Sequence, residues 1–304
     1  MNTPRRSSPP PLRSSAEQRR GDPEKMSRLM TRGSDLRWSA IGGLVTLVYL
    51  LPVYWMLSTS FKPIGEIFAT PPTLVPIPPA IRSYTEVAFG DGDVTRGLVN
   101  TAIIATGTTV LTLAMAVPAA FALARLRLRF VGIVLMLFLV VQMVPSVNIA
   151  LPMFAIFSKL GLVNTYVGLI IANTSLAVPL AIVILRPYFL SVPGEILEAA
   201  SIDGCNTFSA FMRVAVPVSV PGIITVAMIT FLQAWGEFVF GLALATDERM
   251  QPITVVLAGL NNAFGTRWND VMAVSAVVAL PVIVAFVFLQ KYIVTGLTEG
   301  ASKG

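Results

Sequence analysis

The chain has no histidine and a single cysteine, Cys205, among its 304 residues. The absence of histidine excludes Ser-His-Asp and Cys-His catalysis. A lone cysteine also excludes disulfide frameworks and zinc sites that need several Cys ligands, so we predict no catalytic residues and no metal site.

Charge is scarce as well: 12% of the residues are charged, against about 25% in ordinary soluble domains, and 55% are hydrophobic. This composition predicts a protein that is solvated by membrane lipid.

Six long blocks of the sequence are nearly free of charge, and none alternates between apolar and polar residues. About twenty apolar residues cross a hydrocarbon core of roughly 30 Å as a helix, whereas barrel strands would alternate over about ten residues. We therefore predict an all-α polytopic membrane protein with six transmembrane helices. The predicted spans are 38–59, 98–124, 130–157, 165–185, 221–245 and 271–292. The prolines inside them are expected to kink the helices without breaking them, namely Pro52, Pro118, Pro145, Pro152, Pro179 and Pro281.

The first 37 residues are rich in proline, serine and arginine and contain no apolar run. They therefore predict a disordered basic arm and not a signal peptide, which would need an apolar stretch. We expect a six-helix permease domain over 38–293 and a tail over 294–304.

Positive charge indicates which side of the membrane each connection faces. With the N-terminus inside, six of the 22 Lys and Arg residues fall in outer segments and the other sixteen in inner ones. Cytoplasmic loops carry such an excess, so both termini are predicted to be cytoplasmic. The basic residues are not interleaved with aromatics on one surface, which argues against a nucleic-acid partner.

The connection between the fourth and fifth spans predicts a short helix over 193–204. Pro193 suits the first helical turn, Glu195 and Glu198 suit its positive N-terminal end, and Gly204 suits its stop. A stripe at i, i+3, i+4 and i+7 consists of Ile196, Ala199, Ala200 and Asp203. An interfacial helix on lipid headgroups usually has Lys or Arg on its polar face, whereas this one is acidic and rich in alanine. We therefore predict that it docks into a groove on another protein.

This segment resembles the EAA loop of binding-protein-dependent ABC importers, through Glu198-Ala-Ala-x-x-Asp203-Gly204 followed by Pro217-x-x-x-Pro221. Further stretches between residues 38 and 304 are similar to MalG-like permeases of the carbohydrate-uptake branch. They include Tyr49-Leu-Leu-Pro52, Asn100-Thr101, Gly161-Leu-Val-Asn164-Thr165 and Trp235-Gly-Glu237-Phe238, where Gly236 replaces the family's usual asparagine.

The resemblance implies a type I ABC importer permease fold, with a coupling helix between transmembrane helices 4 and 5, in a bacterial cytoplasmic membrane. It implies that the coupling helix contacts an ATPase subunit, with Glu198 paired to a basic residue there and Ala199 and Ala200 in close contact. The implied coupling residues are Glu195, Ile196, Glu198, Ala199, Ala200, Asp203, Gly204 and Phe208. A C-terminal contact with the ATPase dimer is implied for Gly296, Leu297, Thr298, Gly300 and Lys303.

The same resemblance implies an outer loop that meets a solute-binding protein, at Gly259, Leu260, Asn261, Asn262 and Phe264. Polar or aromatic groups in or near the predicted spans are candidates for a sugar path, because sugars need amide hydrogen bonds and ring stacking. These candidates are Gln142, Asn148, Asn173, Trp235 and Glu237. Glu237 can equally face water or a neighbouring subunit, and each of the other four is more often a contact between helices than part of a path.

The sequence contains no Gly-x-x-x-x-Gly-Lys-Ser/Thr loop, so the energy for transport is expected from another polypeptide. The predicted protein is thus a non-enzymatic permease that binds no cofactor itself, while ATP and magnesium serve a partner ATPase dimer. A second homologous permease subunit, a solute-binding protein and membrane lipid complete the expected partners. The resemblance to the carbohydrate-uptake branch implies that the solute is a sugar, a di- or oligosaccharide, and that it moves by alternating access. Glycerol phosphate or another polar solute stays open as an alternative. An ion-driven secondary transporter would show inverted repeats and coupling carboxylates, whereas we find no repeat and a solitary Glu237. A membrane scaffold that merely recruits an ATPase stays open as an alternative.

Overall fold

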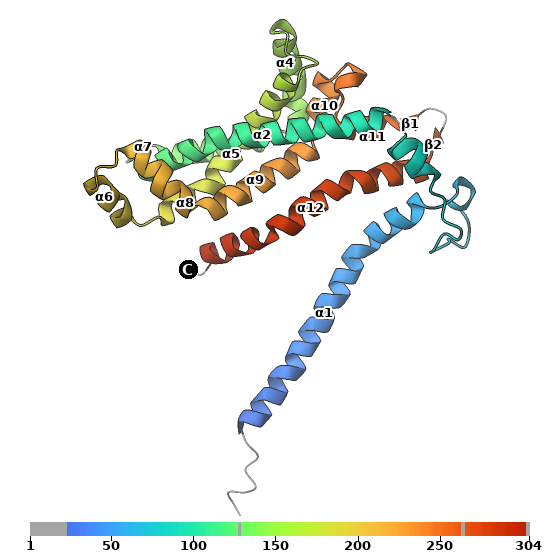
Figure 1. Ribbon diagram of the computed structural model, residues 1–304, viewed down its shortest axis with the longest axis horizontal. Helices are drawn as coiled ribbons and strands as arrows, with labels where there is room; N and C mark the ends of the chain where they lie inside the picture. Colours follow the sequence, from blue (N-terminus) through green and yellow to red (C-terminus); the bar gives the residue numbers. More distant parts are fainter. Residues whose placement is uncertain (1–22, 91, 127–128, 263–264, 302–304) are drawn as a thin grey trace, which may run out of the picture. The chain divides into compact units, whose positions relative to one another are not determined.

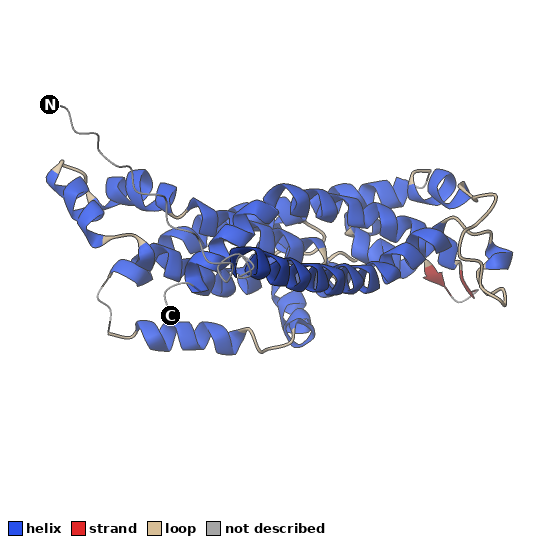
Figure 2. Cartoon of the chain, turned by 90° about the horizontal axis from the view of Figure 1, so that it is seen from below, coloured by secondary structure: helices blue, strands red, loops and turns tan. Residues whose placement is uncertain are grey.

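The computed structural model describes residues 23–90, 92–126, 129–262 and 265–301, and side chains for 38–260 and 266–288 within them. The chain divides into two compact units, Met1–Trp55 and Met56–Gly304. Nearly all of the described chain is helical, with one short pair of strands (Figure 2). The elements are α1 (Pro23–Ser60), η1 (Ile64–Glu66), η2 (Ser83–Ala88), α2 (Gly92–Arg125), α3 (Val131–Val141), α4 (Ser146–Lys159), α5 (Tyr166–Ser191), α6 (Gly194–Ile202), α7 (Thr207–Ala210), η3 (Phe211–Ala215), α8 (Val216–Val218), α9 (Val220–Trp235), α10 (Val239–Leu244), η4 (Glu248–Met250), α11 (Ile253–Gly259), β1 (Asn261–Asn262), β2 (Gly265–Thr266) and α12 (Trp268–Ala301).

Four of these helices are long and apolar enough to cross a membrane, and two bent pairs raise the number to as many as six among the described residues. The four single helices supply the stretches Trp38–Ser60, Gly92–Arg125, Tyr166–Ser191 and Trp268–Phe288. They coincide with the first, second, fourth and sixth predicted spans. The all-helical polytopic architecture is therefore confirmed.

The third predicted span is two helices and not one kinked helix. α3 and α4 meet at 92°, and Pro145 stands in an extended conformation at the N-terminal cap of α4. Proline disfavours helical geometry in the residue before it, which explains a break at Val144. The other five span prolines lie inside helices, as predicted.

The fifth span also differs from its prediction. α9 ends at Trp235, with Gly236 as its C-terminal cap, and α10 is a separate short helix. The bent pair on this side joins 207–218 to 220–235 at 76°, so the span begins upstream of the predicted residue 221.

The two ends of the chain are more helical than predicted. α1 begins at Pro23, which includes residues 23–37 of the expected disordered arm, where Leu, Met, Lys and Arg favour helix. α12 runs on to Ala301, so most of the expected tail over 294–304 continues a helix. Residues 1–22 and 302–304 lie outside the described part.

In the second unit, α2 packs against both α5 and α9, these two also contact each other, and α12 packs along α9 (Figure 1). Small side chains make these approaches close: Ala116, Ala120, Ala181 and Ala215 are almost completely buried where α2, α5 and η3 meet. At Gly222 of α9, an added Cβ would lie 2.4 Å from the ring of Tyr188 in α5. Such packing is typical of membrane helices, which gain no hydrophobic free energy from meeting each other in lipid.

Candidate functional site

α6 stands at one end of the bundle, and its local sequence accounts for its length. Pro193 occupies the N-terminal cap with extended ψ, and Glu195 lies in the first turn. At the other end the Asp203 amide donates to the carbonyl of Ala199 (2.9 Å), and Gly204 takes a φ of +88°. Left-handed φ strongly favours glycine. The predicted short helix between the fourth and fifth spans is therefore present, with the predicted start and stop.

One face of α6 packs onto the bundle and the opposite face is exposed. Leu197 packs against a core cluster that contains Phe189 and Phe211, and Ala200 is buried. The Ala200 carbonyl also accepts the Cys205 amide (2.9 Å). Ala200 is thus largely buried within its own chain, and its contact with another protein stays a prediction.

The exposed face of α6 combines carboxylates with apolar groups. Among the predicted coupling residues it carries Glu195, Ile196, Glu198, Ala199, Asp203, Gly204 and Phe208. It also carries Ile202, which is 87% exposed and which the stripe at i, i+3, i+4 and i+7 did not include. Ile202 lies three residues after Ala199 and four after Glu198, and this helical spacing could have predicted that it shares their face. We call this set, with Ile202 and without Ala200, the α6 face.

A chain of aromatic rings leads from the α6 face into the bundle. Phe208 is 67% exposed, and its ring centroid lies 6.3 Å from that of Phe211. Phe211 in turn contacts Phe121 of α2 at 4.8 Å and Phe189 of α5 at 6.4 Å. Movement of α6 or α7 would therefore press directly on α2 and α5.

Nearer the middle of the bundle, residues of α2, α5 and α9, with Gln142 at the end of α3 and Glu237 after α9, line a partly open cavity of about 150 Å³. We call it the polar cavity. Its lining is Thr108, Gln142, Asn173, Leu176, Ala177, Thr230, Gln233, Ala234 and Glu237. The structure thus brings together three of the five predicted path residues, Gln142, Asn173 and Glu237, and adds Thr108, Thr230 and Gln233, which sequence reasoning missed.

The remaining two path candidates lie elsewhere. Trp235 is 5% exposed, its indole N–H donates to the carbonyl of Val278 in α12 (3.2 Å), and its ring stacks on Phe231. It is a contact between helices. Asn148 is an exposed residue of α4 and is not part of the polar cavity lining.

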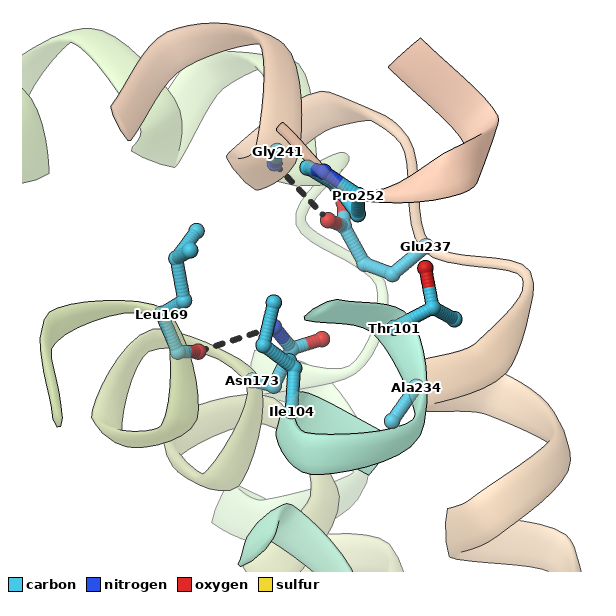
Figure 3. A pocket seen from close by; sticks show the side chains of 8 residues that line it. All are labelled: Thr101, Ile104, Leu169, Asn173, Ala234, Glu237, Gly241 and Pro252. Atoms are coloured by element: carbon cyan, nitrogen blue, oxygen red, sulfur yellow. Dashed lines mark hydrogen bonds between the residues drawn. The ribbon is translucent and has the colours of Figure 1, made fainter. Parts of the chain in front are cut away.

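Hydrogen bonds hold the polar side chains of the cavity in place. Gln142 donates to the carbonyl of Leu176 (2.7 Å), and Asn173 donates to that of Leu169 (2.9 Å). The Glu237 carboxylate accepts the backbone amides of Phe240 (2.8 Å) and Gly241 (3.1 Å) at the start of α10. Figure 3 shows the Glu237 and Asn173 side chains in a smaller adjoining recess, which shares these two residues and Ala234 with the polar cavity.

At the opposite end of the bundle from α6, side chains of α2 hold the segment between α10 and α11. Asn100 is buried, donates to the carbonyls of Arg249 and Gln251 (both 2.9 Å), and accepts the Tyr166 hydroxyl (2.7 Å). Thr101 accepts the amide of Ile253 at the start of α11 (2.8 Å). These contacts fix the chain just before the β1–β2 hairpin.

Two of the five residues of the predicted binding-protein loop, Asn261 and Asn262, form the first strand of the hairpin. Asn261 pairs with Thr266 and Asn262 with Gly265 in antiparallel register, after Gly259 and Leu260 end α11. Phe264 lies outside the described residues. In the predicted C-terminal contact, Gly296, Leu297, Thr298 and Gly300 belong to α12, and Lys303 lies outside the described residues.

Comparisons with known proteins agree with this architecture. Residues 116–299 match the family described as "Binding-protein-dependent transport system inner membrane component". The chain is 33% identical over 272 residues to the sulfoquinovosyl glycerol transport system permease SmoH of Agrobacterium fabrum, covering 90% of this chain and 95% of that one. It is 31% identical to the diacetylchitobiose uptake permease DasC of Streptomyces coelicolor (88% and 97% covered) and 32% identical to the trehalose transport permease SugB of Mycobacterium tuberculosis (88% and 97%).

A solved structure supports the fold independently. A chain in the crystal structure of a bacterial ABC transporter involved in the import of the acidic polysaccharide alginate superposes with a TM-score of 0.72. The match covers 93% of this chain and 99% of that one at 20% identity. Together with the family match over more than half of the sequence, this shows that the chain is a multi-pass membrane protein of the binding-protein-dependent transport system inner membrane component family, with the fold of an ABC importer permease.

Proposed function

We propose that the chain is one of two homologous permease subunits of an ATP-driven importer that moves a sugar, delivered by a solute-binding protein, into the cytoplasm. The solutes named for its relatives support a sugar: sulfoquinovosyl glycerol, diacetylchitobiose, trehalose and arabinooligosaccharides. A dimer of ATPase subunits, which binds the ATP and magnesium, would supply the energy. The excess of Lys and Arg in the segments on the α6 side supports a cytoplasmic location for both termini in a bacterial inner membrane.

The α6 face carries this proposal. An isoleucine that is 87% exposed on a short helix outside the membrane spans leaves apolar area in water unless another protein covers it. The neighbouring carboxylates of Glu195 and Glu198 would meet basic groups at the edge of that contact. We assign the α6 face to the ATPase subunit, and Gly296, Leu297, Thr298, Gly300 and Lys303 to a second contact with it. Ala200 supports α6 from inside the chain.

The outer hairpin and the loop around it suit the solute-binding protein. Residues 259–264 lie at and after the end of α11, and Thr101 of α2 is hydrogen-bonded to the first residue of α11. A force that the binding protein exerts on the hairpin would therefore be transmitted to α2. The polar cavity between α2, α5 and α9 would be this subunit's part of the solute path. Alternating access then requires that ATPase closure, acting on α6, moves α2 and α5 around that cavity.

Reconstitution tests the proposal. The chain is purified together with the permease, ATPase and binding protein that are encoded beside its gene. The complex is then placed in liposomes. Uptake of radiolabelled trehalose, diacetylchitobiose and arabinotriose is then measured. We expect uptake of at least one sugar that needs both ATP on the α6 side and the binding protein on the other. Uptake driven by an ion gradient without ATP would identify a secondary transporter, and complex formation without any uptake would identify a scaffold.

Membrane orientation is tested separately. Cys205 is the only cysteine, so Cys205→Ser gives a cysteine-free chain on which a thiol is introduced by Glu198→Cys. A membrane-impermeant maleimide should label this thiol in inside-out vesicles and not in right-side-out ones. Labelling from the outer side would overturn the assignment of α6 to the ATPase.

A further inference from the structure

We infer that the polar cavity is a binding site for one neutral sugar residue on this subunit, an inference that rests on the proposed sugar transport. Its volume of about 150 Å³ exceeds the roughly 30 Å³ that one water occupies and falls below the roughly 300–1,000 Å³ of pockets for drug-sized ligands. The cavity therefore holds a single ring of a longer solute.

The side chains around the cavity provide what sugar hydroxyls need. Amides come from Gln142, Asn173 and Gln233, and a hydroxyl comes from Thr230. Gln142 and Asn173 each use an amide N–H for a backbone carbonyl, and the oxygens of both amides have no protein donor among the described residues. A sugar hydroxyl can donate to such oxygens.

Thr108 gives a second, independent indication that the cavity takes a ligand. Its side chain is 1% exposed and lines the cavity, and its hydroxyl has no hydrogen-bond partner among the described residues. Thr109 and Thr225 donate to their own helix, to Ala105 (2.7 Å) and Pro221 (2.9 Å), whereas Thr112 and Thr174 also lack a partner among the described residues but do not line the polar cavity. A buried hydroxyl that is left without a partner is costly, and a ligand hydroxyl would remove that cost.

The charge of the cavity selects against anionic sugars. Glu237 is the only ionisable side chain among the described lining residues, and no Lys or Arg is among them. Its carboxylate is held by two backbone amides and keeps acceptor capacity for hydroxyl donors. A uronate or sulfonate group placed here would meet a like charge inside the membrane, where Coulomb repulsion is far stronger than in water. The relatives do not decide this point: sulfoquinovosyl glycerol carries a sulfonate and alginate is acidic, whereas diacetylchitobiose and trehalose are neutral.

The sharpest test compares Thr108→Val with Thr112→Val in the reconstituted importer. The two residues lie one turn apart in α2, both are buried, and both have hydroxyls without a partner among the described residues, but only Thr108 lines the polar cavity. Valine keeps the shape of threonine, so neither variant should misfold. At limiting sugar-loaded binding protein, Thr108→Val should lower trehalose uptake about threefold to tenfold, the worth of one hydrogen bond, while Thr112→Val leaves it unchanged.

A second variant tests selection by charge. Wild-type importer should take up trehalose and exclude digalacturonate, and Glu237→Gln should raise the ratio of digalacturonate to trehalose uptake about tenfold or more. A purely structural loss at the start of α10 would lower both rates and leave the ratio unchanged.

The outcomes separate the two proposals. Equal uptake by the Thr108→Val and Thr112→Val variants, or wild-type import of digalacturonate at the rate of trehalose, overturns the neutral-sugar site and leaves sugar import standing. A wild-type importer that moves no sugar of the panel with ATP and binding protein overturns the proposed function itself.

Discussion

The guanidinium of Arg125, the last residue of α2, donates a hydrogen bond to the carbonyl of Phe189 near the end of α5 (2.8 Å). The same nitrogen donates to the carbonyl of Val192, the residue that joins α5 to Pro193 and α6. Both carbonyls belong to buried residues, and the last carbonyls of a helix have no partner within it. Arg125 therefore fixes α2 to the joint from which α6 departs.

Replacing Arg125 should weaken the link between α6 and the transport helices. Arg125→Gln leaves buried carbonyls without donors, which costs about 1–3 kcal/mol, and frees the angle at Val192. We expect uptake per ATP hydrolysed to fall severalfold, with partial rescue in Arg125→Lys, whose ammonium keeps N–H donors but is not a planar guanidinium. Sugar uptake and phosphate release, measured on the same liposomes, check this.

The matched control is Arg186→Gln. Arg186 of α5 donates to the carbonyl of Leu123 in α2 (3.2 Å), so it joins the same two helices without touching the α5–α6 joint. It should lower thermal stability and leave uptake per ATP unchanged. Equal coupling defects in both variants would show that Arg125 acts only by holding the bundle together.

Ile202 should anchor the ATPase subunit. Covering an isoleucine side chain contributes about 2 kcal/mol, which corresponds to about a 30-fold change in Kd. Ile202→Asp should therefore weaken binding of the purified ATPase dimer to the permease pair in nanodiscs by at least that factor. Ser201→Ala, which removes a hydroxyl bonded within α6 to the Leu197 carbonyl, should leave Kd unchanged. Wild-type affinity of the Ile202→Asp variant would remove the α6 face from the interface.

Substitutions at Glu198 and Gly204 should uncouple ATP hydrolysis from transport. Glu198→Lys reverses a charge on the exposed side of α6, and Gly204→Pro is incompatible with the φ of +88° that ends the helix. Both chains should still insert in the membrane, since neither residue lies in a span, but ATP hydrolysis should no longer produce uptake. Gly204→Ala, which costs only about 1–2 kcal/mol in the left-handed region, should keep part of the uptake. Normal uptake by the first two variants would refute these roles.

The sequence predicted α6 well because its signals are local, whereas the face that α6 presents depends on distant residues. Pro193 and Gly204 mark its ends, but Leu197 packs against the cluster that contains Phe211 and Phe189, and no periodicity within a nine-residue helix reports that contact. The break at Pro145 was missed for a similar reason. Prolines inside α1, α2, α5 and α12 leave those helices continuous, so the residue type alone does not separate a kink from a break.

Part of the lining of the polar cavity could be predicted from the sequence. Gln142, Asn173 and Glu237 were recognisable because they are polar or charged residues in or near otherwise apolar spans. Thr108 was not, because span threonines with a bonded hydroxyl, such as Thr109, and without one, such as Thr112, cannot be told apart in the sequence. Only the tertiary arrangement of α2, α5 and α9 distinguishes a threonine that lines a cavity from one that does not.

The close approach of α9 to α5 should fail when Gly222 acquires a larger side chain. A Cβ there would lie 2.4 Å from the Tyr188 ring, so the ring or one of the two helices must shift. Overpacking of this kind costs about 1–3 kcal/mol, so Gly222→Ala should lower the thermal unfolding midpoint of the detergent-solubilised complex by several degrees, and Gly222→Leu should lower it further.

Gly194→Ala serves as the control, because nothing lies within 4 Å of its added Cβ. Combining Gly222→Ala with Tyr188→Ala should restore part of the loss, since removing the ring makes room for the methyl group. An unchanged midpoint in Gly222→Leu would mean that α5 and α9 stand further apart in the membrane than this packing requires.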